Sequence, residues 1–256
     1  MKINFKGFYF SFRPIFLATT LFFSALTAQS AIIPRLKSGE NLKLAAIGTS
    51  LTDKGHNNKG WFEHMGEWLN ALPYKGKVTY SNHAVGGSAS KTDSATGAGR
   101  CGLLQLSDVL ANENPDAIFI EFAINDAFTP YHISEQESKE NLQTMINQIK
   151  EWAGRQNQGK GKIVDIIVQT MNNCINSHAQ KRPNLEQYYQ GYRDVVRANP
   201  GVLLIDNYTN WIKLYNSQAG HSTWNSYVPD GIHPNADGDR EVLIRQVQKK
   251  LKQQHK

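Results

Sequence analysis

Leu42-Lys43-Leu44-Ala45-Ala46-Ile47-Gly48-Thr49-Ser50-Leu51-Thr52 is an apolar run that passes directly into a small polar turn. The apolar half predicts a buried strand, and the turn places Ser50 just beyond the strand's carboxyl end. A serine in this place is suited to act as a nucleophile, but a serine after a strand more often belongs to an ordinary turn or a helix cap. This segment alone therefore leaves the role of Ser50 open.

The far end of the chain carries the partners that a serine nucleophile needs, in the segment Asp230-Gly231-Ile232-His233. A hydroxyl is a poor nucleophile until a neighbouring imidazole takes its proton, and a carboxylate fixes the tautomer of that imidazole. Asp-Gly is also a common turn pair. Taken with Ser50, Asp230 and His233 are nevertheless candidates for a catalytic triad.

Two further polar segments follow predicted strands. Asn82-His83-Ala84-Val85-Gly86-Gly87-Ser88 comes after the strand-like residues 77–80, and Ala123-Ile124-Asn125-Asp126 comes after the apolar run 117–122. Taken singly, the glycine pair would suit a flexible turn and Asn125 a helix cap. In an open parallel sheet, however, active sites form outside the carboxyl ends of the strands. The four segments together therefore indicate one site.

Short apolar runs alternate with longer amphipathic stretches along the chain. Strands are predicted near residues 42–47, 77–82, 116–122, 162–169 and 202–206, and helices near 60–71, 102–112, 134–153, 185–198 and 236–253. This alternation predicts an α/β fold with a mostly parallel sheet covered on both faces. We expect a three-layer α/β/α sandwich of five strands, with residues 31–256 forming one domain.

The four polar segments resemble the blocks of the SGNH hydrolases, also called GDSL esterases and lipases. The resemblance places the nucleophile on Ser50, the glycine of the second block on Gly87 and the asparagine of the third block on Asn125. It places the Asp-x-x-His block on Asp230 and His233. All the blocks occur in family order between residues 48 and 233. The resemblance implies a flavodoxin-like sandwich and a serine hydrolase acting on ester bonds.

The resemblance also implies an oxyanion hole, made by the backbone N–H groups of Ser50 and Gly87 and the side-chain amide of Asn125. Two positions depart from the family pattern. The usual aspartate before the nucleophile is Thr49, and the usual glycine two positions before the asparagine is Ala123. Neither change removes a group that takes part in catalysis. We expect no metal and no organic cofactor, since the Cys and His spacing matches no zinc site.

Residues 1–30 have the pattern of a secretory signal peptide: a basic start, an apolar stretch and a small-residue cleavage site. We therefore expect export to the periplasm or the medium, without stable membrane insertion after cleavage. Without Lys2, Lys6 and Arg13 the net charge falls from +6 to +3. The mature chain has no concentrated basic face, which argues against nucleic acid as a partner.

Two cysteines and several aromatic residues suggest further features. Cys101 and Cys174 could pair after export, because both fall in loop-like stretches after predicted strands. The aromatic-rich stretch 207–229 precedes the candidate catalytic histidine. Its Trp224 and Tyr227 are candidates for a stacking face for a sugar ring, although packing in the core explains such residues equally well.

These observations favour an exported esterase that removes short acyl groups, acetyl in particular, from a carbohydrate. The predicted loops around Ser50 are polar and small, whereas a lipid-cleaving enzyme needs apolar surface to hold its acyl chain. The same residues would also serve a lipase, phospholipase, thioesterase or acyltransferase. An inactive glycan-binding protein on the same scaffold is the alternative from another class. The oligomeric state is left open.

Overall fold

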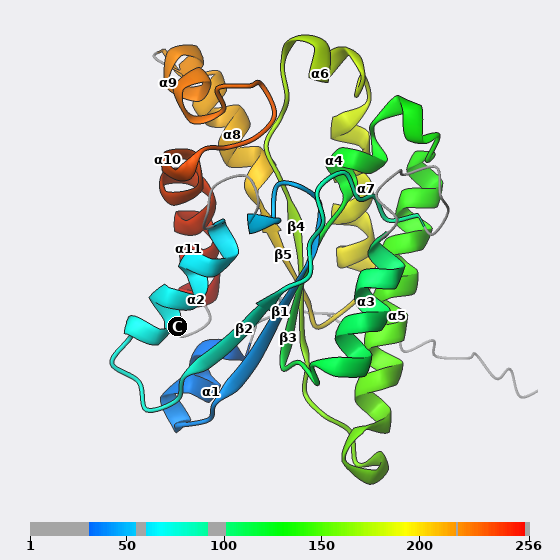
Figure 1. Cartoon of the computed structure of the whole chain (residues 1–256), viewed down its shortest axis with the longest axis vertical. Helices are drawn as coiled ribbons and strands as arrows, with labels where there is room; N and C mark the ends of the chain where they lie inside the picture. Colours follow the sequence, from blue (N-terminus) through cyan, green and yellow to red (C-terminus); the bar gives the residue numbers. More distant parts are fainter. Residues whose placement is uncertain (1–30, 55–59, 92–100, 219, 254–256) are drawn as a thin grey trace, which may run out of the picture.

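A five-stranded parallel sheet forms the centre of the protein (Figure 1). The computed structural model describes residues 31–54, 60–91, 101–218 and 220–253, so the predicted signal peptide lies outside it. The strands are β1 (Leu42–Gly48), β2 (Val78–Asn82), β3 (Ala117–Glu121), β4 (Asp165–Thr170) and β5 (Val202–Asp206). They are ordered β2-β1-β3-β4-β5, and every neighbouring pair is parallel. The predicted fold class is confirmed.

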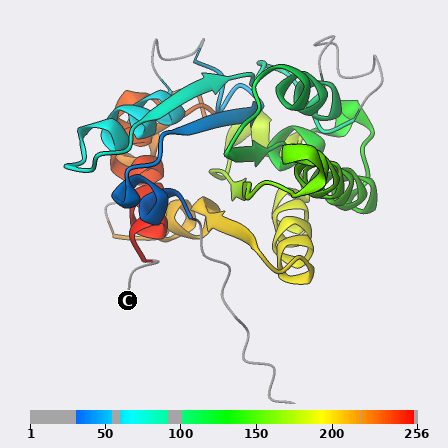
Figure 2. The same ribbon diagram turned by 90° about the horizontal axis from the view of Figure 1, so that it is seen from below.

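Helices cover both faces of the sheet, as the view from below shows (Figure 2). One face carries α1 (Ile32–Ser38), α2 (Trp61–Ala71), α8 (Asn207–Tyr215), α9 (Gly220–Tyr227), α10 (Ala236–Gly238), the π-helical turn η4 (Asp239–Ile244) and α11 (Arg245–Lys252). The other face carries α3 (Gly102–Asn112), α5 (Glu135–Gly159) and α7 (Leu185–Ala198). The short α4 (Ala123–Asp126), η3 (Thr129–Tyr131) and α6 (Asn176–Gln180) lie beyond the carboxyl ends of β3 and β4.

The central strands owe their place to sequences that are apolar on both sides. Every residue of β3 and β4 is buried, and in β1 only Lys43 is exposed. Such runs are typical of parallel strands covered by helices on both faces. Helix α5 packs an apolar stripe into this core, with Leu142, Met145, Ile146 and Ile149 all buried. Its predicted start is confirmed, since the Ser134 side chain accepts a hydrogen bond from the Glu137 N–H.

The strand order places the functional edge of the sheet. The chain passes from β1 to β2 on one side and then crosses to β3 on the other, so the direction of winding reverses between β1 and β3. Ligand sites of open α/β sheets form at this switch point, beyond the carboxyl ends of the strands. Ser50 follows β1 and Asn125 follows β3. No helix among residues 31–54, 60–91, 101–218 and 220–253 is long and apolar enough to cross a membrane.

Candidate active site

The turn after β1 brings Ser50 to the surface at the switch point. Gly48 ends the strand where a Cβ would lie 2.5 Å from Oε1 of Glu121, so a side chain there would displace the buried carboxyl. The chain then turns, and the carbonyl of Thr49 accepts hydrogen bonds from the N–H groups of Thr52 and Asp53. Thr49 is fully buried, whereas Ser50 is partly exposed.

Ser50, His233 and Asp230 form a continuous hydrogen-bond chain. The Oγ of Ser50 lies 2.9 Å from Nε2 of His233, and Nδ1 of His233 lies 2.5 Å from Oδ2 of Asp230. An ionised carboxylate only accepts hydrogen bonds, so Nδ1 carries the ring proton and Nε2 presents its lone pair to the serine hydroxyl. The structure therefore brings the three predicted residues together in the order that proton transfer from serine requires.

The loop after α9 delivers Asp230 and His233 as one unit. The Oδ1 atom of Asp230 accepts hydrogen bonds from the N–H groups of Ile232 and His233, at 2.9 and 2.7 Å. Partial burial works to raise the pKa of the Asp230 carboxyl, but these hydrogen bonds, and then the one from the His233 ring, outweigh it and lower the pKa. The carboxylate thus stays ionised and holds the imidazole in one tautomer.

The backbone N–H groups of Ser50 and Gly87 are the two that the resemblance assigns to the oxyanion hole. Among the described residues, none accepts a hydrogen bond from the N–H of Ser50 or of Gly87. Gly87 has a φ of 80°, a conformation that favours glycine. Its neighbour Gly86 donates its N–H to Oδ2 of Asp53 at 2.9 Å, which ties this turn to the nucleophile turn. Both N–H groups therefore remain candidate oxyanion donors.

The side-chain amide of Asn125 is held in one orientation from two sides. Its Nδ2 donates to the carbonyl of Ser88 at 2.8 Å, and its Oδ1 accepts from Nη2 of Arg182 at 3.2 Å. Because the guanidinium can only donate and the carbonyl can only accept, the oxygen and nitrogen of the amide cannot be exchanged. One of the two Nδ2 hydrogens serves Ser88, which leaves the second available for an oxyanion.

Arg182 is a residue of this site that the sequence did not reveal. It is 7 % exposed, its Nε donates to the carbonyl of Ile124 at 2.8 Å, and its guanidinium lies 4.7 Å from the ring centre of Phe128. No carboxylate of the described residues forms an ion pair with it, and burial lowers its pKa. Phe128 also packs edge-on against Tyr131, whose hydroxyl donates to the carbonyl of Gly87 at 2.8 Å.

Comparison with known proteins gives the family. Residues 46–241 match the model of the GDSL-like lipase/acylhydrolase family. The chain belongs to this family. It is therefore a serine hydrolase that acts on ester bonds, and the predicted resemblance is confirmed. No curated protein sequence matches the chain.

Solved structures of low sequence identity share the fold of this GDSL-family chain. The acetylxylan esterase Axe2 from Geobacillus stearothermophilus superposes with a TM-score of 0.62 at 18 % identity, covering 84 % of this chain and 96 % of Axe2. TesA gives a TM-score of 0.59 at 19 % identity, covering 83 % of this chain and 99 % of TesA. Both comparisons support the three-layer architecture.

A buried carboxyl from β3 lies under the nucleophile turn of this GDSL-family enzyme. Oε1 of Glu121 accepts hydrogen bonds from the N–H and the hydroxyl of Thr49 and from the hydroxyl of Thr52, at 2.7, 2.9 and 2.9 Å. Thr49 stands where the family usually has an aspartate, so the carboxyl next to the turn comes here from the neighbouring strand. Burial raises the pKa of Glu121 to about 7, against the opposing effect of the hydrogen bonds from Thr49 and Thr52.

Titration of Glu121 predicts a pH-dependent stability. Because the pKa is about 7 in the folded protein and 4.5 for a model glutamate, folding favours the protonated form. Protonated Glu121 therefore contributes to the free energy of unfolding. This contribution is complete below about pH 4.5 and is lost as the pH rises through 7. We expect Glu121→Gln to gain on the order of 1–3 kcal/mol relative to wild type between pH 5 and 8, since one pKa unit corresponds to about 1.36 kcal/mol.

Denaturant unfolding at a series of pH values measures this difference. Glu151→Gln is the matched control, because Glu151 is exposed on α5. Parallel stability curves for wild type and Glu121→Gln between pH 5 and 8 would contradict this prediction, because they would mean that Glu121 is ionised in the folded as well as in the unfolded state.

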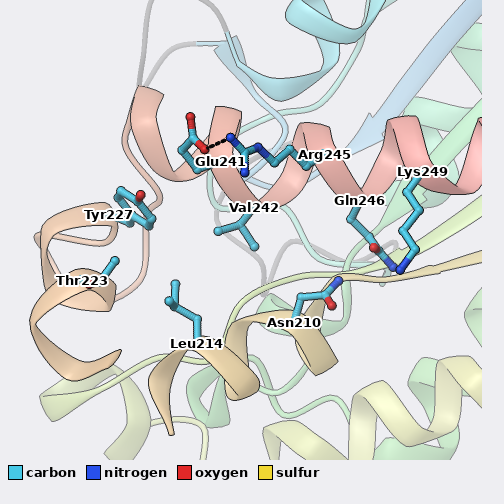
Figure 3. Close-up of a pocket in the computed structure, with 9 residues that line it drawn as sticks. All are labelled: Asn210, Leu214, Thr223, Tyr227, Glu241, Val242, Arg245, Gln246 and Lys249. Carbon is cyan, nitrogen blue, oxygen red and sulfur yellow. Dashed lines mark ion pairs between the residues drawn. The ribbon is translucent and has the colours of Figure 1, made fainter. Parts of the chain in front are cut away.

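The two aromatic residues predicted to bind substrate do not lie beside Ser50. Trp224 is fully buried, and its Nε1 donates to Oδ1 of Asn173 at 2.9 Å, so it is a core residue and the prediction of a stacking face is wrong for it. Tyr227 lines a depression of about 390 Å³ between α8, α9 and α11, together with Leu214 and Arg245 (Figure 3). That depression contains no residue of the Ser50–His233–Asp230 chain.

The predicted disulfide between Cys101 and Cys174 is also wrong, since both cysteines are free and buried. They belong to different layers. Cys101 precedes α3, where the adjoining Gly102 packs against Met145 of α5. Cys174 follows β4 and faces the side of α8 and α9, and burial raises the pKa of its thiol.

Proposed function

We propose that this enzyme is an exported esterase that removes short acyl groups, acetyl in particular, from carbohydrate, with Ser50, His233 and Asp230 as its catalytic triad. The hydrogen-bond chain from Ser50 Oγ through the His233 ring to Asp230 is the observation that carries the chemistry. The catalytic mutants of Axe2 replace a serine, an aspartate and a histidine singly by alanine, and its aspartate and histidine are three positions apart, as Asp230 and His233 are.

In this mechanism Ser50 Oγ attacks the ester carbonyl while its proton passes to Nε2 of His233. Asp230 stabilises the resulting imidazolium. The carbonyl oxygen becomes negative and receives hydrogen bonds from the N–H groups of Ser50 and Gly87 and from Nδ2 of Asn125. His233 returns the proton to the leaving alcohol oxygen, which leaves an acyl group on Ser50. Water then attacks this acyl-enzyme, again with His233 as the base, and releases the acid.

The small depression at Ser50 supports a short acyl group. The depression at Ser50 holds only about 10 Å³ and is bounded by Leu51, His233 and Pro234. Such a volume corresponds to about one water molecule, so this depression itself holds no part of a long hydrocarbon chain. A lipid-cleaving enzyme would need an apolar channel, worth about 0.8 kcal/mol per buried CH₂ group.

Openness to solvent supports hydrolysis as the outcome of the acyl-enzyme. The Asp230 side chain is 50 % exposed and His233 is 23 % exposed, so water can reach the bond that must be cleaved. An acyltransferase benefits instead from a site that excludes water. The signal-like residues 1–30 support export, which would bring the enzyme to extracellular polysaccharides.

Hydrolysis of a series of 4-nitrophenyl esters from two to twelve carbons tests the acyl-chain prediction. We expect kcat/KM to be highest for acetate or butyrate and to fall by at least about tenfold by eight carbons, because the longer chain stays in water and is held by no apolar surface. Release of acetate from acetylated xylan, mannan and pectin tests the carbohydrate part. A rise in kcat/KM beyond eight carbons, with no acetate released from any polysaccharide, would favour a lipase instead.

A further inference from the structure

A second groove borders the loop that carries Asp230 and His233. It has a volume of about 460 Å³ and lies between the β4–α6 segment and the ends of α8 and α9, lined by Cys174, Ile175, Asn176, Tyr215, His221 and Asn225. Figure 1 places α6, α8 and α9 at the end of the molecule to which the strands' carboxyl ends point. The groove therefore opens on the same edge of the sheet as Ser50.

Direct contacts join this groove to the catalytic loop. The N–H of Ile175 donates to the carbonyl of Gly231 at 3.0 Å. A Cβ on Gly231 would lie 3.2 Å from Cγ1 of Ile175, so the Gly231 backbone packs closely against the Ile175 side chain. Gly231 follows Asp230 and stands two residues before His233. A molecule in the groove would consequently lie beside the aspartate–histidine pair.

The aromatic side of the groove is held from behind by the core. The rings of Tyr215 and His221 are tilted by 32° with their centres 4.1 Å apart. Tyr215 also packs edge-on against the buried Trp224, with ring centres 5.7 Å apart. Because the indole of Trp224 is itself fixed by its hydrogen bond to Asn173, the ring of Tyr215 has a firm support.

The remaining groups of the groove suit a neutral, hydroxyl-rich ligand. The amides of Asn176 and Asn225, both exposed, each offer two donors and one acceptor oxygen. No lysine, arginine, aspartate or glutamate is among the described residues that line the groove. A pyranose ring presents an apolar C–H face, which packs against flat rings, and an edge of hydroxyls, which bind amides.

We infer that this groove is a glycan subsite, which binds a sugar unit of the polysaccharide next to the acylated unit over Ser50. This inference rests on the proposed carbohydrate esterase function. It also relocates the sugar-binding face of the stretch 207–229 from Trp224 and Tyr227 to the ring pair Tyr215 and His221. Asn225 supplies hydrogen bonds at the edge of that pair.

The test compares the purified variants His221→Ala and Asn225→Ala with wild type, on acetylated xylan and on 4-nitrophenyl acetate. Both side chains are exposed, so their removal does not open the core. We expect KM for the polysaccharide to rise and the ratio of kcat/KM, polysaccharide over 4-nitrophenyl acetate, to fall about tenfold. A tenfold change corresponds to 1.4 kcal/mol, the scale of one or two lost contacts. Tyr215→Phe should retain the wild-type ratio, since it keeps the ring.

Tyr227→Ala is the matched control, because Tyr227 lies on α9 but lines the other depression. Its ratio of kcat/KM, polysaccharide over 4-nitrophenyl acetate, should be that of wild type.

The possible outcomes separate the subsite from the proposed function. If wild type releases acetate from the polysaccharide and the His221 and Asn225 variants keep its ratio, the subsite is wrong while the proposed function stands. If wild type cleaves 4-nitrophenyl acetate but no acetylated polysaccharide, the proposed carbohydrate function is wrong and the subsite with it. An equal loss on both substrates would also overturn the subsite, because it would mean that these residues act on the reacting centre.

Discussion

Ser50→Ala is expected to abolish ester hydrolysis, with a loss in kcat of about 10⁵–10⁶, the scale for removing a serine nucleophile. The physical reason is that no acyl-enzyme can form without the Oγ atom, although the oxyanion donors and His233 remain in place. The side chain is small and partly exposed, and its recorded partner is the His233 ring, so its removal should leave the fold intact. Initial rates on 4-nitrophenyl acetate measure the effect.

Ser107→Ala is the matched control, because Ser107 is an exposed serine of α3. A fluorophosphonate probe, which reacts covalently with activated serines, should label wild type and Ser107→Ala but not Ser50→Ala. Turnover within tenfold of wild type by a Ser50→Ala protein with an unchanged melting temperature would exclude Ser50 as the nucleophile.

The sheet was predictable because the sequence of each central strand is recognisable by itself. β1, β3 and β4 are short apolar runs buried on both faces, and each is followed by small or polar residues. Such runs can be recognised without tertiary information. The helices α2, α3, α5 and α7 were predictable for a similar reason, since each buries apolar residues at helical spacing. The helix predicted near residues 236–253 is instead a succession of α10, the π-helical turn η4 and α11.

The shorter helices were not predicted, and their local sequences explain why. Helix α8 begins directly after β5, where the last residue of the strand, Asp206, caps the helix through its side chain. Helices α6 and α4 are five and four residues long. Elements of this length cover little more than one turn of helix, which is too short to show apolar periodicity. They form because the strands before them fix where the chain begins to turn.

The candidate site likewise contains residues that the sequence predicts and residues that it does not. Ser50, Gly87, Asn125, Asp230 and His233 stand at recognisable positions after strands or in a compact motif. Glu121 and Arg182 do not, because their roles depend on contacts with residues 57 to 72 positions away in the sequence. The single sign in the sequence was a charged residue inside the apolar run of β3. The sequence likewise did not show that Trp224 points into the core, since its hydrogen-bond partner Asn173 lies 51 residues away.

Replacement of Asn125 by alanine is expected to lower kcat by about 10²–10³, the scale for one lost oxyanion donor. KM for 4-nitrophenyl acetate should change little, because the amide binds the charge that develops in the transition state more strongly than the ground-state carbonyl. Arg182→Met should lower kcat by a smaller factor, about 10- to 100-fold, because the amide stays but loses the group that fixes its oxygen. The kcat of Arg182→Lys should lie between those of wild type and Arg182→Met, since lysine keeps the charge but not the planar fork.

A double-mutant cycle separates this positioning role of Arg182 from a general effect on the fold. If Arg182 acts through the Asn125 amide, the double variant should be no slower than Asn125→Ala alone, because the group that Arg182 positions is already gone. Arg193→Met is the matched control, since the half-buried Arg193 likewise lies near an aromatic ring but pairs with Asp206 at β5. Additive losses in the double variant would show that Arg182 supports catalysis independently of Asn125. A loss below tenfold in Asn125→Ala, at unchanged stability, would mean that its second Nδ2 hydrogen does not reach the oxyanion.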